Sequence, residues 1–412
     1  MDFFAYKDHE LFCEDVNLSE IATLYGTPTY VYSRKSIESQ IDSYKKSFTQ
    51  KDNLICFSVK SLNNISILNI INKNGCGFDV VSGGELQKVC HVGADPKKII
   101  FSGVGKSNEE ISLGVRNQIL SFNIESESEL YRIEKIASSM DMTANIAIRF
   151  NPEIDSGGHE YIKTGRKGDK FGISSEKSIL NISNYIYQSN NLKLVGLACH
   201  IGSQILDLKS YRLAAKNIKN LANKVKQIVK VLDFLDLGGG LGISYFKSKI
   251  PTPKELVAVI EKELDDMNEK IILEPGRSIS GNAGVLLTNV EYIKDNFLIV
   301  DAAMNDLIRP ALYKANHDVW NVKKTDLNKK QWTIVGPVCE SSDIIAKDHE
   351  ISASEGDLLA IRSAGAYGFV MSSNYNARTR APEILVNRDK FDVIRTRESF
   401  EDLIKNEVNI ND

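Results

Sequence analysis

Eight short apolar runs recur along the first two thirds of this chain, and each ends in glycine or in a polar residue of a catalytic type. The runs are 54–60, 76–81, 98–103, 119–125, 144–150, 193–201, 231–237 and 269–274. They end at or near Lys60, Asp79, Gly103, Glu125, Arg149, His200, Gly238 and Glu274. Amphipathic segments with a helical period lie between them. This alternation predicts a closed (β/α)8 barrel of the TIM type, whose reactive side chains lie at the C-terminal ends of its strands.

Beyond Ser280 the apolar runs are no longer separated by long helices. The runs there are 285–293, 297–300, 332–338, 358–361 and 391–394, with turn residues at 355–357 and 387–389. Short strands separated by turns predict a β-domain. The expected fold class is therefore α/β plus β. An N-terminal barrel would occupy residues 26–280, and a C-terminal β-sandwich or β-barrel would occupy 281–412 and take in residues 1–25.

Two shorter segments also carry predictions. Asn17-Leu18-Ser19-Glu20 predicts a capping box at the start of a helix that Gly26 would end. The stretch 155–170 contains four glycines and is longer than a usual βα loop, so it is a candidate lid over the barrel mouth.

Charge and composition argue against several classes of protein. The formal net charge is -3 at pH 7 with both signs interspersed, which gives no electrostatic reason to bind nucleic acid or anionic lipid. No apolar run approaches the roughly 20 residues that span a bilayer, and the first residues do not have the pattern of a signal peptide. The six cysteines have no metal-ligand spacing and indicate free thiols in a reducing compartment. We therefore expect a cytoplasmic protein with no metal, nucleic-acid or membrane partner.

Two of the strand ends suggest covalent chemistry and phosphate binding. Lys60 ends an apolar strand, where partial desolvation favours the neutral amine that attacks a carbonyl. A lysine that merely ends a strand in solvent fits the same position. Gly238, Gly239 and Gly240 follow the seventh strand, where backbone amides can approach a phosphate closely. A flexible turn is the alternative explanation of these glycines.

The other candidate site residues indicate a function only when they are considered together. Glu274 and Arg277 follow the eighth strand, where they could hold a protonated heterocyclic nitrogen and clamp an anion, or could form a surface ion pair. Taken alone, His200 is typical of a core histidine, Cys339 of a small buried residue, and Tyr367 of a core or turn residue. A lysine, a phosphate cradle, a carboxylate and an imidazole or aromatic plane on one barrel rim together describe a pyridoxal phosphate site.

From Pro28 to about Glu383 the chain also resembles a known family, the alanine-racemase-type barrel decarboxylases that use pyridoxal phosphate. Within that family it is most similar to the members that act on meso-diaminopimelate. The matching motifs are Val59-Lys60, Asp79-Val80-Val81-Ser82-Gly83-Gly84-Glu85-Leu86, Lys170-Phe171-Gly172, His200-Ile201-Gly202-Ser203-Gln204, the three glycines, Glu274-Pro275-Gly276-Arg277-Ser278, Asn305-Asp306-Leu307-Ile308-Arg309-Pro310-Ala311-Leu312-Tyr313, Gly336-Pro337-Val338-Cys339-Glu340 and Ala366-Tyr367-Gly368.

The resemblance implies a cofactor-binding role for many of the matched positions. Lys60 would bind the cofactor covalently, His200 would stack on its ring, and Glu274 would pair with its ring nitrogen. Asp79 would also belong to the cofactor site. The residues around the phosphate would be Ser203, Gly238, Gly239, Gly240, Gly276, Arg277 and Tyr367.

The resemblance also implies how the substrate would be bound. Arg309 and Tyr313 would hold the distal carboxylate of meso-diaminopimelate, and Glu340 its distal ammonium, with Arg277 and Tyr367 also facing substrate. Cys339 would donate a proton to the α-carbon after carbon dioxide leaves. Because Cys339 and Glu340 come from the partner subunit in such enzymes, a homodimer with shared active sites is implied. The expected reaction yields L-lysine, as the last step of its biosynthesis.

Several alternatives fit less well. A related decarboxylase acting on ornithine, arginine or carboxynorspermidine would not need Arg309 beside Arg277, because two buried guanidinium groups without an anion cost several kcal/mol. Racemases of this type place an arginine at the ring nitrogen, whereas Glu274 strengthens the electron sink. Non-catalytic carriers lack the β-domain, and inactive homologues tend to lose the lysine or the cysteine, but Lys60 and Cys339 are both present.

Overall fold

The chain forms two compact units in a computed structural model. The model describes residues 3–49, 52–155, 165, 168–246, 249–325 and 328–410. One unit, here called the barrel unit, comprises residues Gln40–Ile243 and Ile250–Ser278. The other, here called the β unit, comprises Met1–Ser39, Ser244–Lys249 and Ile279–Asp412. Most of the candidate lid at 155–170 lies outside the described residues.

The barrel unit contains a closed ring of eight parallel strands in the order β10-β11-β12-β5-β6-β7-β8-β9. The strands are β5 (Leu54–Ser58), β6 (Gly77–Val80), β7 (Ile99–Phe101), β8 (Ser121–Ile124), β9 (Ala144–Arg149), β10 (Leu192–Ala198), β11 (Phe234–Asp236) and β12 (Lys270–Leu273). Each overlaps one of the eight predicted runs, so the predicted barrel is confirmed. Their residues are almost all buried because helices cover the outside of the ring.

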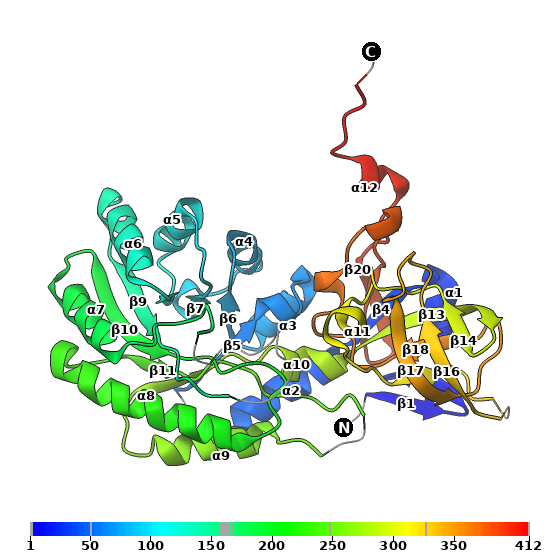
Figure 1. The fold of residues 1–412 in the computed structure, drawn as a ribbon, viewed down its shortest axis with the longest axis horizontal. Coiled ribbons are helices and arrows are strands. Elements are labelled where there is room, and N and C mark those ends of the chain that lie inside the picture. Colours follow the sequence, from blue (N-terminus) through cyan, green and yellow to red (C-terminus); the bar gives the residue numbers. More distant parts are fainter. Residues whose placement is uncertain are drawn as a thin grey trace. The chain divides into compact units, whose positions relative to one another are not determined.

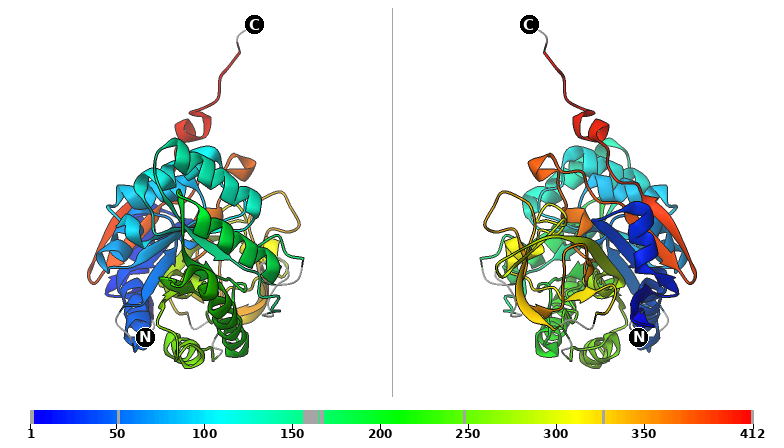
Figure 2. Two further views of the ribbon diagram at one scale, coloured as in Figure 1. Left: turned by 90° about the vertical axis from the view of Figure 1, so that its left-hand side faces the viewer. Right: turned by 90° about the vertical axis from the view of Figure 1, so that its right-hand side faces the viewer.

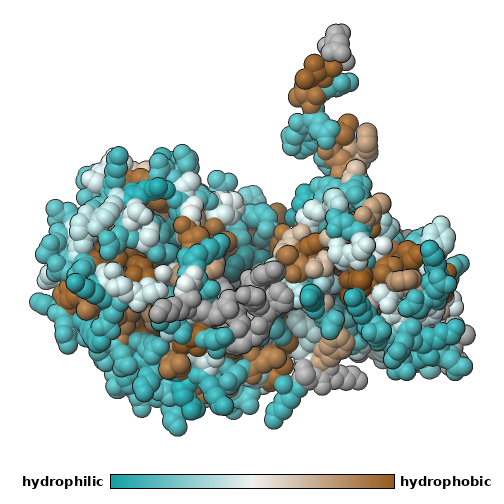
Figure 3. All heavy atoms as spheres, in the orientation of Figure 1, coloured by the Kyte–Doolittle hydropathy of each residue, from teal (hydrophilic) through white to brown (hydrophobic). Residues whose placement is uncertain are grey.

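Helix α2 precedes the first barrel strand, a helix follows each of the eight strands, and the helices surround the ring (Figure 1; Figure 2). They are α2 (Arg34–Ser47), α3 (Ile65–Lys73), α4 (Gly83–His91), α5 (Asn108–Asn117), α6 (Glu127–Ser139), α7 (Glu176–Gln188), α8 (Leu208–Val229), α9 (Pro253–Glu263) and the short α10 (Arg277–Ser280). Helix α9 begins with a capping box between Thr252 and Glu255 and with Pro253 in its first turn. On the face of the barrel unit that Figure 3 shows, hydrophilic residues predominate.

Small and large side chains fill the inside of the barrel. Cys56, Ala147 and Phe234 belong to a fully buried cluster that also includes Ile100, Val195 and Ile272. Gly196 on β10 leaves room for the Phe234 ring, since a Cβ at Gly196 would lie 2.5 Å from that ring. The interior is therefore a packed core, as barrels of this size require.

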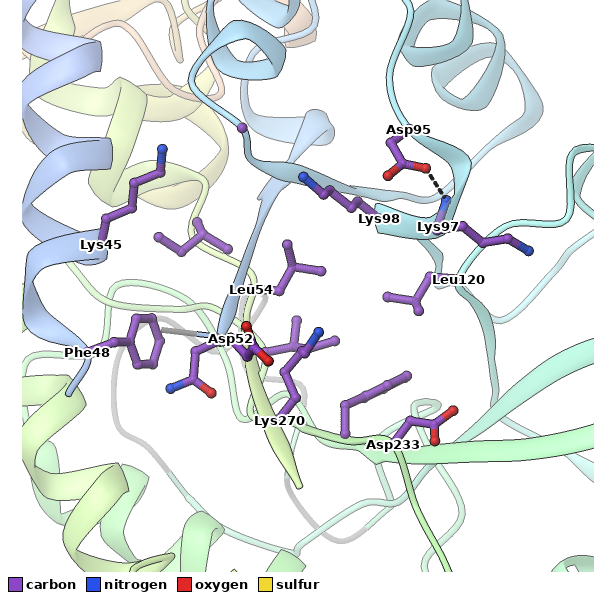
Figure 4. A pocket seen from close by; sticks show the side chains of 15 residues that line it. Lys45, Phe48, Asp52, Leu54, Asp95, Lys97, Lys98, Leu120, Asp233 and Lys270 are labelled. Carbon is purple, nitrogen blue, oxygen red and sulfur yellow. Dashed lines mark hydrogen bonds between the residues drawn. The ribbon is translucent and has the colours of Figure 1, made fainter. Parts of the chain in front are cut away.

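The N-terminal end of the barrel holds an open cavity of about 620 Å³ with charges of both signs in its lining (Figure 4). Its lysines are Lys45, Lys97, Lys98 and Lys270, and its aspartates are Asp52, Asp95 and Asp233. Lys45 donates to the carbonyl of Asn74 at the end of α3, and Lys97 donates to the carbonyl of Gln118 at the end of α5. Cations placed there stabilise helix C-termini, so these two lysines have a structural explanation.

The β unit is built around one nine-stranded sheet, whose main path runs β17-β16-β14-β13-β4-β19-β20. Its strands are β4 (Thr29–Ser33), β13 (Gly284–Lys294), β14 (Phe297–Val300), β15 (Val319–Asn321), β16 (Lys330–Val335), β17 (Ile344–Ile351), β18 (Leu358–Ile361), β19 (Glu383–Asn387) and β20 (Lys390–Arg395). A small separate sheet contains β1 (Phe4–Lys7), β2 (Glu10–Cys13) and β3 (Val16–Asn17). The short helices are α1 (Leu18–Tyr25), α11 (Arg309–Tyr313) and α12 (Phe400–Ile404). The predicted β-domain is thus confirmed.

Strand β4 falls within 26–280, the range predicted for the barrel. In the structure it pairs antiparallel with β13 and parallel with β19, and all five of its residues are buried in the sheet of the β unit. The predicted ranges 26–280 and 281–412 with 1–25 remain a proposal about domain organisation.

The N-terminal helix begins differently from the prediction. The side chain of Asn17 accepts from the amide of Ser19 at 2.8 Å, so it caps α1 through the residue two positions on and not through Glu20. Glu20 is exposed. Gly26 ends the helix with a φ of 68°, as predicted. Within the part of the chain that the structure describes, no helix has the length and apolar character needed to cross a membrane.

A buried lysine supports the C-terminal rim of the barrel. The Lys106 side chain is 1% exposed and pairs with Glu129 at 2.6 Å, and its ammonium also donates to the carbonyls of Gly103 and Asn123. These contacts join the segment after β7 to the end of β8 and the start of α6. Removing the ammonium would leave a buried carboxylate and two carbonyls without their donor.

We therefore expect Lys106→Met to lower the free energy of unfolding of the barrel by about 3–5 kcal/mol, the usual cost of breaking a buried ion pair. Lys97→Met is the matched control, because this exposed lysine makes one carbonyl contact at 3.0 Å. Denaturant unfolding of both variants measures the difference. Equal, small losses in the two variants would contradict a supporting role for Lys106.

Candidate active site

A cavity of about 300 Å³ opens at the C-terminal ends of the barrel strands. Lys60, His200 and Glu274, predicted from the ends of three different runs, all line it. The other lining residues are Val81, Ser102, Gly103, Val104, Asn123, Arg149, Phe171, Ala198, Cys199 and Asp236. The barrel thus brings together side chains that are more than 200 residues apart in the sequence, as the strand-end pattern predicts.

Lys60 lies in a single 3-10 turn that follows β5. Its ammonium contacts an oxygen of Asp79 on β6 at 2.6 Å, and the Lys60 side chain is 34% exposed while that of Asp79 is fully buried. The same Asp79 oxygen accepts from the hydroxyl of Ser58 at 2.9 Å. Asp79 therefore anchors the lysine in the cavity, a pairing that the sequence alone did not indicate.

Three buried carboxylates lie around this lysine. Asp79 and Asp236 are at most 1% exposed and Glu274 is 6% exposed. Burial raises the pKa of Asp236 to about 6. Burial, followed by the charges of Asp236 and Asp79, raises the pKa of Glu274 well above its usual range. These shifts are typical of functional sites, where desolvation and like charges act on the same group.

Two of these carboxylates still have an oxygen with no partner. Among the residues that the structure describes, Oε1 of Glu274 and Oδ1 of Asp79 are buried and accept no hydrogen bond. An unsatisfied buried acceptor is costly, so it marks a place where a donor from a bound molecule would be stabilised. Within the same described residues, no group of His, Cys, Asp and Glu is arranged to hold a metal ion.

His200 follows β10, and its half-buried ring lines the cavity. The backbone amide of Gly239 donates to Nδ1 of His200 at 3.1 Å, which leaves Nε2 as the protonated nitrogen of the neutral ring. Burial, aided by the positive charges of Arg149 and Lys60, holds the pKa of His200 well below its usual range. A neutral imidazole of fixed tautomer is suited to stack on a heteroaromatic ring.

The three glycines after β11 are required first by packing. A Cβ at Gly239 would lie 2.0 Å from the carbonyl oxygen of Glu274, and one at Gly240 would lie 2.3 Å from that of Gly202. Gly238 has a φ of 67° and its amide donates to Asp236 at 2.8 Å. Because the Gly239 amide is used by His200, the amide of Gly240 is the one in this run without an acceptor among the described residues.

Arg277, Gly276 and Ser203 form a second cluster near the strand ends. Arg277 begins α10 and is 6% exposed, and its Nη2 donates to the hydroxyl of Ser203 at 3.0 Å. A Cβ at Gly276 would lie 2.9 Å from the Cβ of Ser58, so only glycine fits between β5 and β12 at this point. A buried guanidinium with a hydroxyl beside it can bind a phosphate or a carboxylate.

Arg149 lines the cavity and pairs with Glu125, and the sequence reasoning assigned neither residue a role although both are strand ends. They form an ion pair at 2.9 Å, with side chains 10% and 2% exposed. Glu125 also accepts from the amides of Gly103 at 3.2 Å and Gly172 at 2.8 Å. The pair therefore joins three neighbouring strand ends to the segment at Phe171, whose ring lies 5.0 Å from the Arg149 guanidinium.

Arg309, Tyr313, Cys339, Glu340 and Tyr367, the remaining predicted residues, lie in the β unit. Arg309 and Tyr313 lie one helical turn apart at the two ends of α11, and Arg309 is 4% exposed. Its Nη1 lies 2.7 Å from Nε2 of the buried His317. Tyr367 lies in a turn with a φ of 55°, in the left-handed region.

Cys339 and Glu340 lie in the turn between β16 and β17. Cys339 is exposed, and its amide donates to the side chain of Asn376 at 3.1 Å. Glu340 is also exposed and accepts from the hydroxyls of Tyr375 at 2.6 Å and Ser342 at 2.9 Å. These two hydrogen bonds lower the pKa of Glu340, so it is an anion over the physiological range.

Comparisons with known proteins agree on one group of relatives. The profile of a family described as "Pyridoxal-dependent decarboxylase, pyridoxal binding domain" matches residues 34–281. The chain is 44% identical to diaminopimelate decarboxylase of Pseudomonas aeruginosa, with 99% of each chain covered. It is 45% identical to that of Neisseria meningitidis serogroup B, with 97% of each covered. Diaminopimelate decarboxylase from Helicobacter pylori, solved in complex with L-lysine, matches with a TM-score of 0.92 at 40% identity, covering 94% of this chain and 98% of that chain.

The raised pKa of Asp236 has a consequence for stability. A carboxyl group that binds protons more tightly in the folded than in the unfolded state loses stabilising free energy as pH rises. For Asp236 the loss spans the window from its ordinary value of 3.8 to about 6. We expect Asp236→Asn in the ligand-free protein to raise Tm relative to wild type by more at pH 7.5 than at pH 4.5.

Thermal unfolding at the two pH values measures this difference. Asp233→Asn is the matched control, because this carboxylate is exposed and lies three residues earlier, beside Lys193 at 3.4 Å. Its Tm difference from wild type should be nearly the same at both pH values. A Tm difference for Asp236→Asn that does not grow with pH would contradict the raised pKa of Asp236.

Proposed function

The chain belongs to the pyridoxal-dependent decarboxylases, and we propose from this premise how its residues act on meso-diaminopimelate. It is a carboxy-lyase that uses pyridoxal phosphate, and it converts meso-diaminopimelate to L-lysine and carbon dioxide, the last step of lysine biosynthesis. One observation carries the assignment of roles. Lys60, which Asp79 anchors, and the buried carboxylate of Glu274 line one cavity. Oε1 of Glu274 accepts no hydrogen bond from the described residues.

The residues of the cavity fit the ring of this cofactor. Pyridoxal phosphate supplies an electron sink for the bonding electrons that remain on the α-carbon when carbon dioxide leaves. Lys60 would bind the cofactor, with Asp79 directing its amine, and the free oxygen of Glu274 would accept a hydrogen bond from the protonated ring nitrogen and keep that nitrogen protonated. His200, held neutral and fixed by the Gly239 amide, would stack on the ring.

The phosphate of the cofactor fits the second cluster of the barrel unit. The Gly240 amide has no acceptor among the described residues, and Arg277 and Ser203 present a guanidinium and a hydroxyl. Gly238, Gly239 and Gly276 would allow the close approach of the backbone, and Tyr367 would add a phenol. A phosphate there would place its negative charge beside a buried cation.

Substrate recognition would depend on charge at both ends of the molecule. Arg309 and Tyr313 would bind the distal carboxylate, and Glu340, an anion, would bind the distal ammonium. Arg277 would also face the substrate. A basic amino acid or carboxynorspermidine offers no matching carboxylate for the buried guanidinium of Arg309, which disfavours these alternative substrates.

Cys339 would return a proton to the α-carbon after carbon dioxide has left. Cys339 and Glu340 are exposed in the single chain, and we propose that they complete the site of a partner subunit in a homodimer. The six cysteines of the chain are all free thiols, which supports the proposal that the protein works in the cytoplasm.

The first test is direct. The purified protein with pyridoxal phosphate should release L-lysine and carbon dioxide from meso-diaminopimelate in equal amounts. Borohydride should fix the cofactor on the peptide that contains Lys60. Lys60→Ala should lose cofactor absorbance and nearly all turnover, because Lys60 is the amine that Asp79 anchors in the cavity.

Lys98→Ala is the matched control for this variant. Lys98 is a half-buried lysine at the N-terminal end of the barrel, where no cofactor is expected (Figure 4). It should keep the colour and turnover of the wild type. A coloured and active Lys60→Ala protein would falsify the role proposed for Lys60.

The shared site can be tested by complementation. Lys60→Ala and Cys339→Ala homodimers should each be nearly inactive. Random exchange of subunits makes half of the dimers mixed, and each mixed dimer has one site with both lesions and one with neither. About a quarter of wild-type activity should therefore return on mixing. If exchange is verified and no activity returns, the two residues serve the same chain.

A further inference from the structure

His317 lies at the centre of a buried polar cluster of the β unit and contacts Arg309. It precedes β15 and has no exposed surface. Its Nδ1 lies 2.8 Å from the carbonyl oxygen of Arg362, and its Nε2 lies 2.7 Å from Nη1 of Arg309. We propose that His317 is a positioning residue that sets substrate specificity, by holding the Arg309 guanidinium in place for the distal carboxylate. This inference rests on the role proposed above for Arg309.

The two contacts fix the protonation state of the imidazole. A backbone carbonyl can only accept, so Nδ1 must carry a hydrogen and donate to Arg362. A guanidinium can only donate, so Nε2 must present its lone pair to Arg309. The neutral ring with its proton on Nδ1 satisfies both partners. No other tautomer of histidine does so.

Tyr245 holds Arg309 from a second direction. The Arg309 guanidinium carbon lies 4.8 Å from the centre of the Tyr245 ring, and that ring meets the His317 ring edge-on at 5.1 Å with an angle of 78°. Tyr245 belongs to the short segment Ser244–Lys249, which lies between β11 and α9 in the sequence and is part of the β unit. The guanidinium is thus fixed by a hydrogen bond and by a cation–π contact.

His317 orients the arginine and, as a neutral ring, does not neutralise it. A carboxylate in the place of His317 would form an ion pair with Arg309 and would compete with a substrate carboxylate for the same charge. A neutral imidazole acceptor occupies one N–H group and brings no negative charge of its own to the arginine. The cluster therefore favours ligands that bring their own anion, which is the property that separates meso-diaminopimelate from a simple diamine.

Two amide variants separate positioning from a merely structural role. The glutamine amide in His317→Gln reaches the place of Nε2 and can still accept from Arg309, whereas the shorter amide in His317→Asn reaches only the place of Nδ1. We expect His317→Asn to raise KM for meso-diaminopimelate about tenfold with kcat changed by less than about threefold, since a hydrogen bond to a charged group is lost. His317→Gln should restore KM to within about threefold of wild type.

Two inhibitors give a readout that does not depend on the amount of folded enzyme. meso-Diaminopimelate has one D and one L centre, and L-lysine keeps the L centre, so the product retains the distal carboxylate. 1,5-Diaminopentane has the same two amines and no carboxylate. Inhibition by L-lysine should weaken about tenfold in His317→Asn, whereas inhibition by 1,5-diaminopentane should not change. His349→Asn is the matched control, a half-buried histidine of the same sheet with Nε2 at 2.8 Å from the Val319 carbonyl.

The outcomes distinguish this inference from the function on which it rests. Arg309→Ala should raise KM sharply, and an unchanged KM would remove the proposed role of Arg309 itself. If Arg309→Ala behaves as expected but both His317 variants match the wild type, His317 does not position the guanidinium. If His317→Asn weakens both inhibitors equally, or if His317→Gln is no better than His317→Asn, the residue is only structural and the proposal is overturned.

Discussion

The concentration of buried negative charge beside Lys60 is the constraint on which the barrel site depends. Four strands that are neighbours in the closed barrel, β11, β12, β5 and β6, deliver Asp236, Glu274, Lys60 and Asp79 in that order. Burial raises the pKa of Glu274 well above its usual range, and repulsion from the carboxylates of Asp236 and Asp79 raises it further. The Lys60 ammonium, the Gly238 amide and the Asn123 side chain offset part of this repulsion.

The two units contribute different physical environments to the proposed reaction. The barrel unit supplies buried groups whose pKa values are strongly shifted, which suits the binding of pyridoxal phosphate as an electron sink. The β unit supplies a buried Arg309 beside the buried His317, and an anionic Glu340 at its surface. Recognition of a substrate with charged groups at both ends and stabilisation of the reacting centre thus depend on separate parts of the chain.

Much of the fold could be predicted because it is local. Each barrel strand is a short apolar run with a polar end, and the period of 2 or 3.6 is visible within a few residues. Strand β17, which was not predicted, lacks this signal. Strand β17 contains Lys347-Asp348-His349-Glu350 and ends the path of its sheet, where exposed polar residues are tolerated. The pairing of β4 with β19 joins residues some 350 positions apart, so no local pattern reports it.

The three-glycine run shows how a motif can be read too narrowly. Gly239 must lack a side chain because the carbonyl of Glu274 occupies that space, and Gly240 because the carbonyl of Gly202 does. These are conditions for closing the barrel at this rim. A homologue that no longer binds a cofactor would still need these glycines as long as it forms the same barrel. The three glycines therefore indicate shared ancestry and a shared fold. The free oxygen of Glu274 beside Lys60 is the better indicator that the catalytic activity is retained.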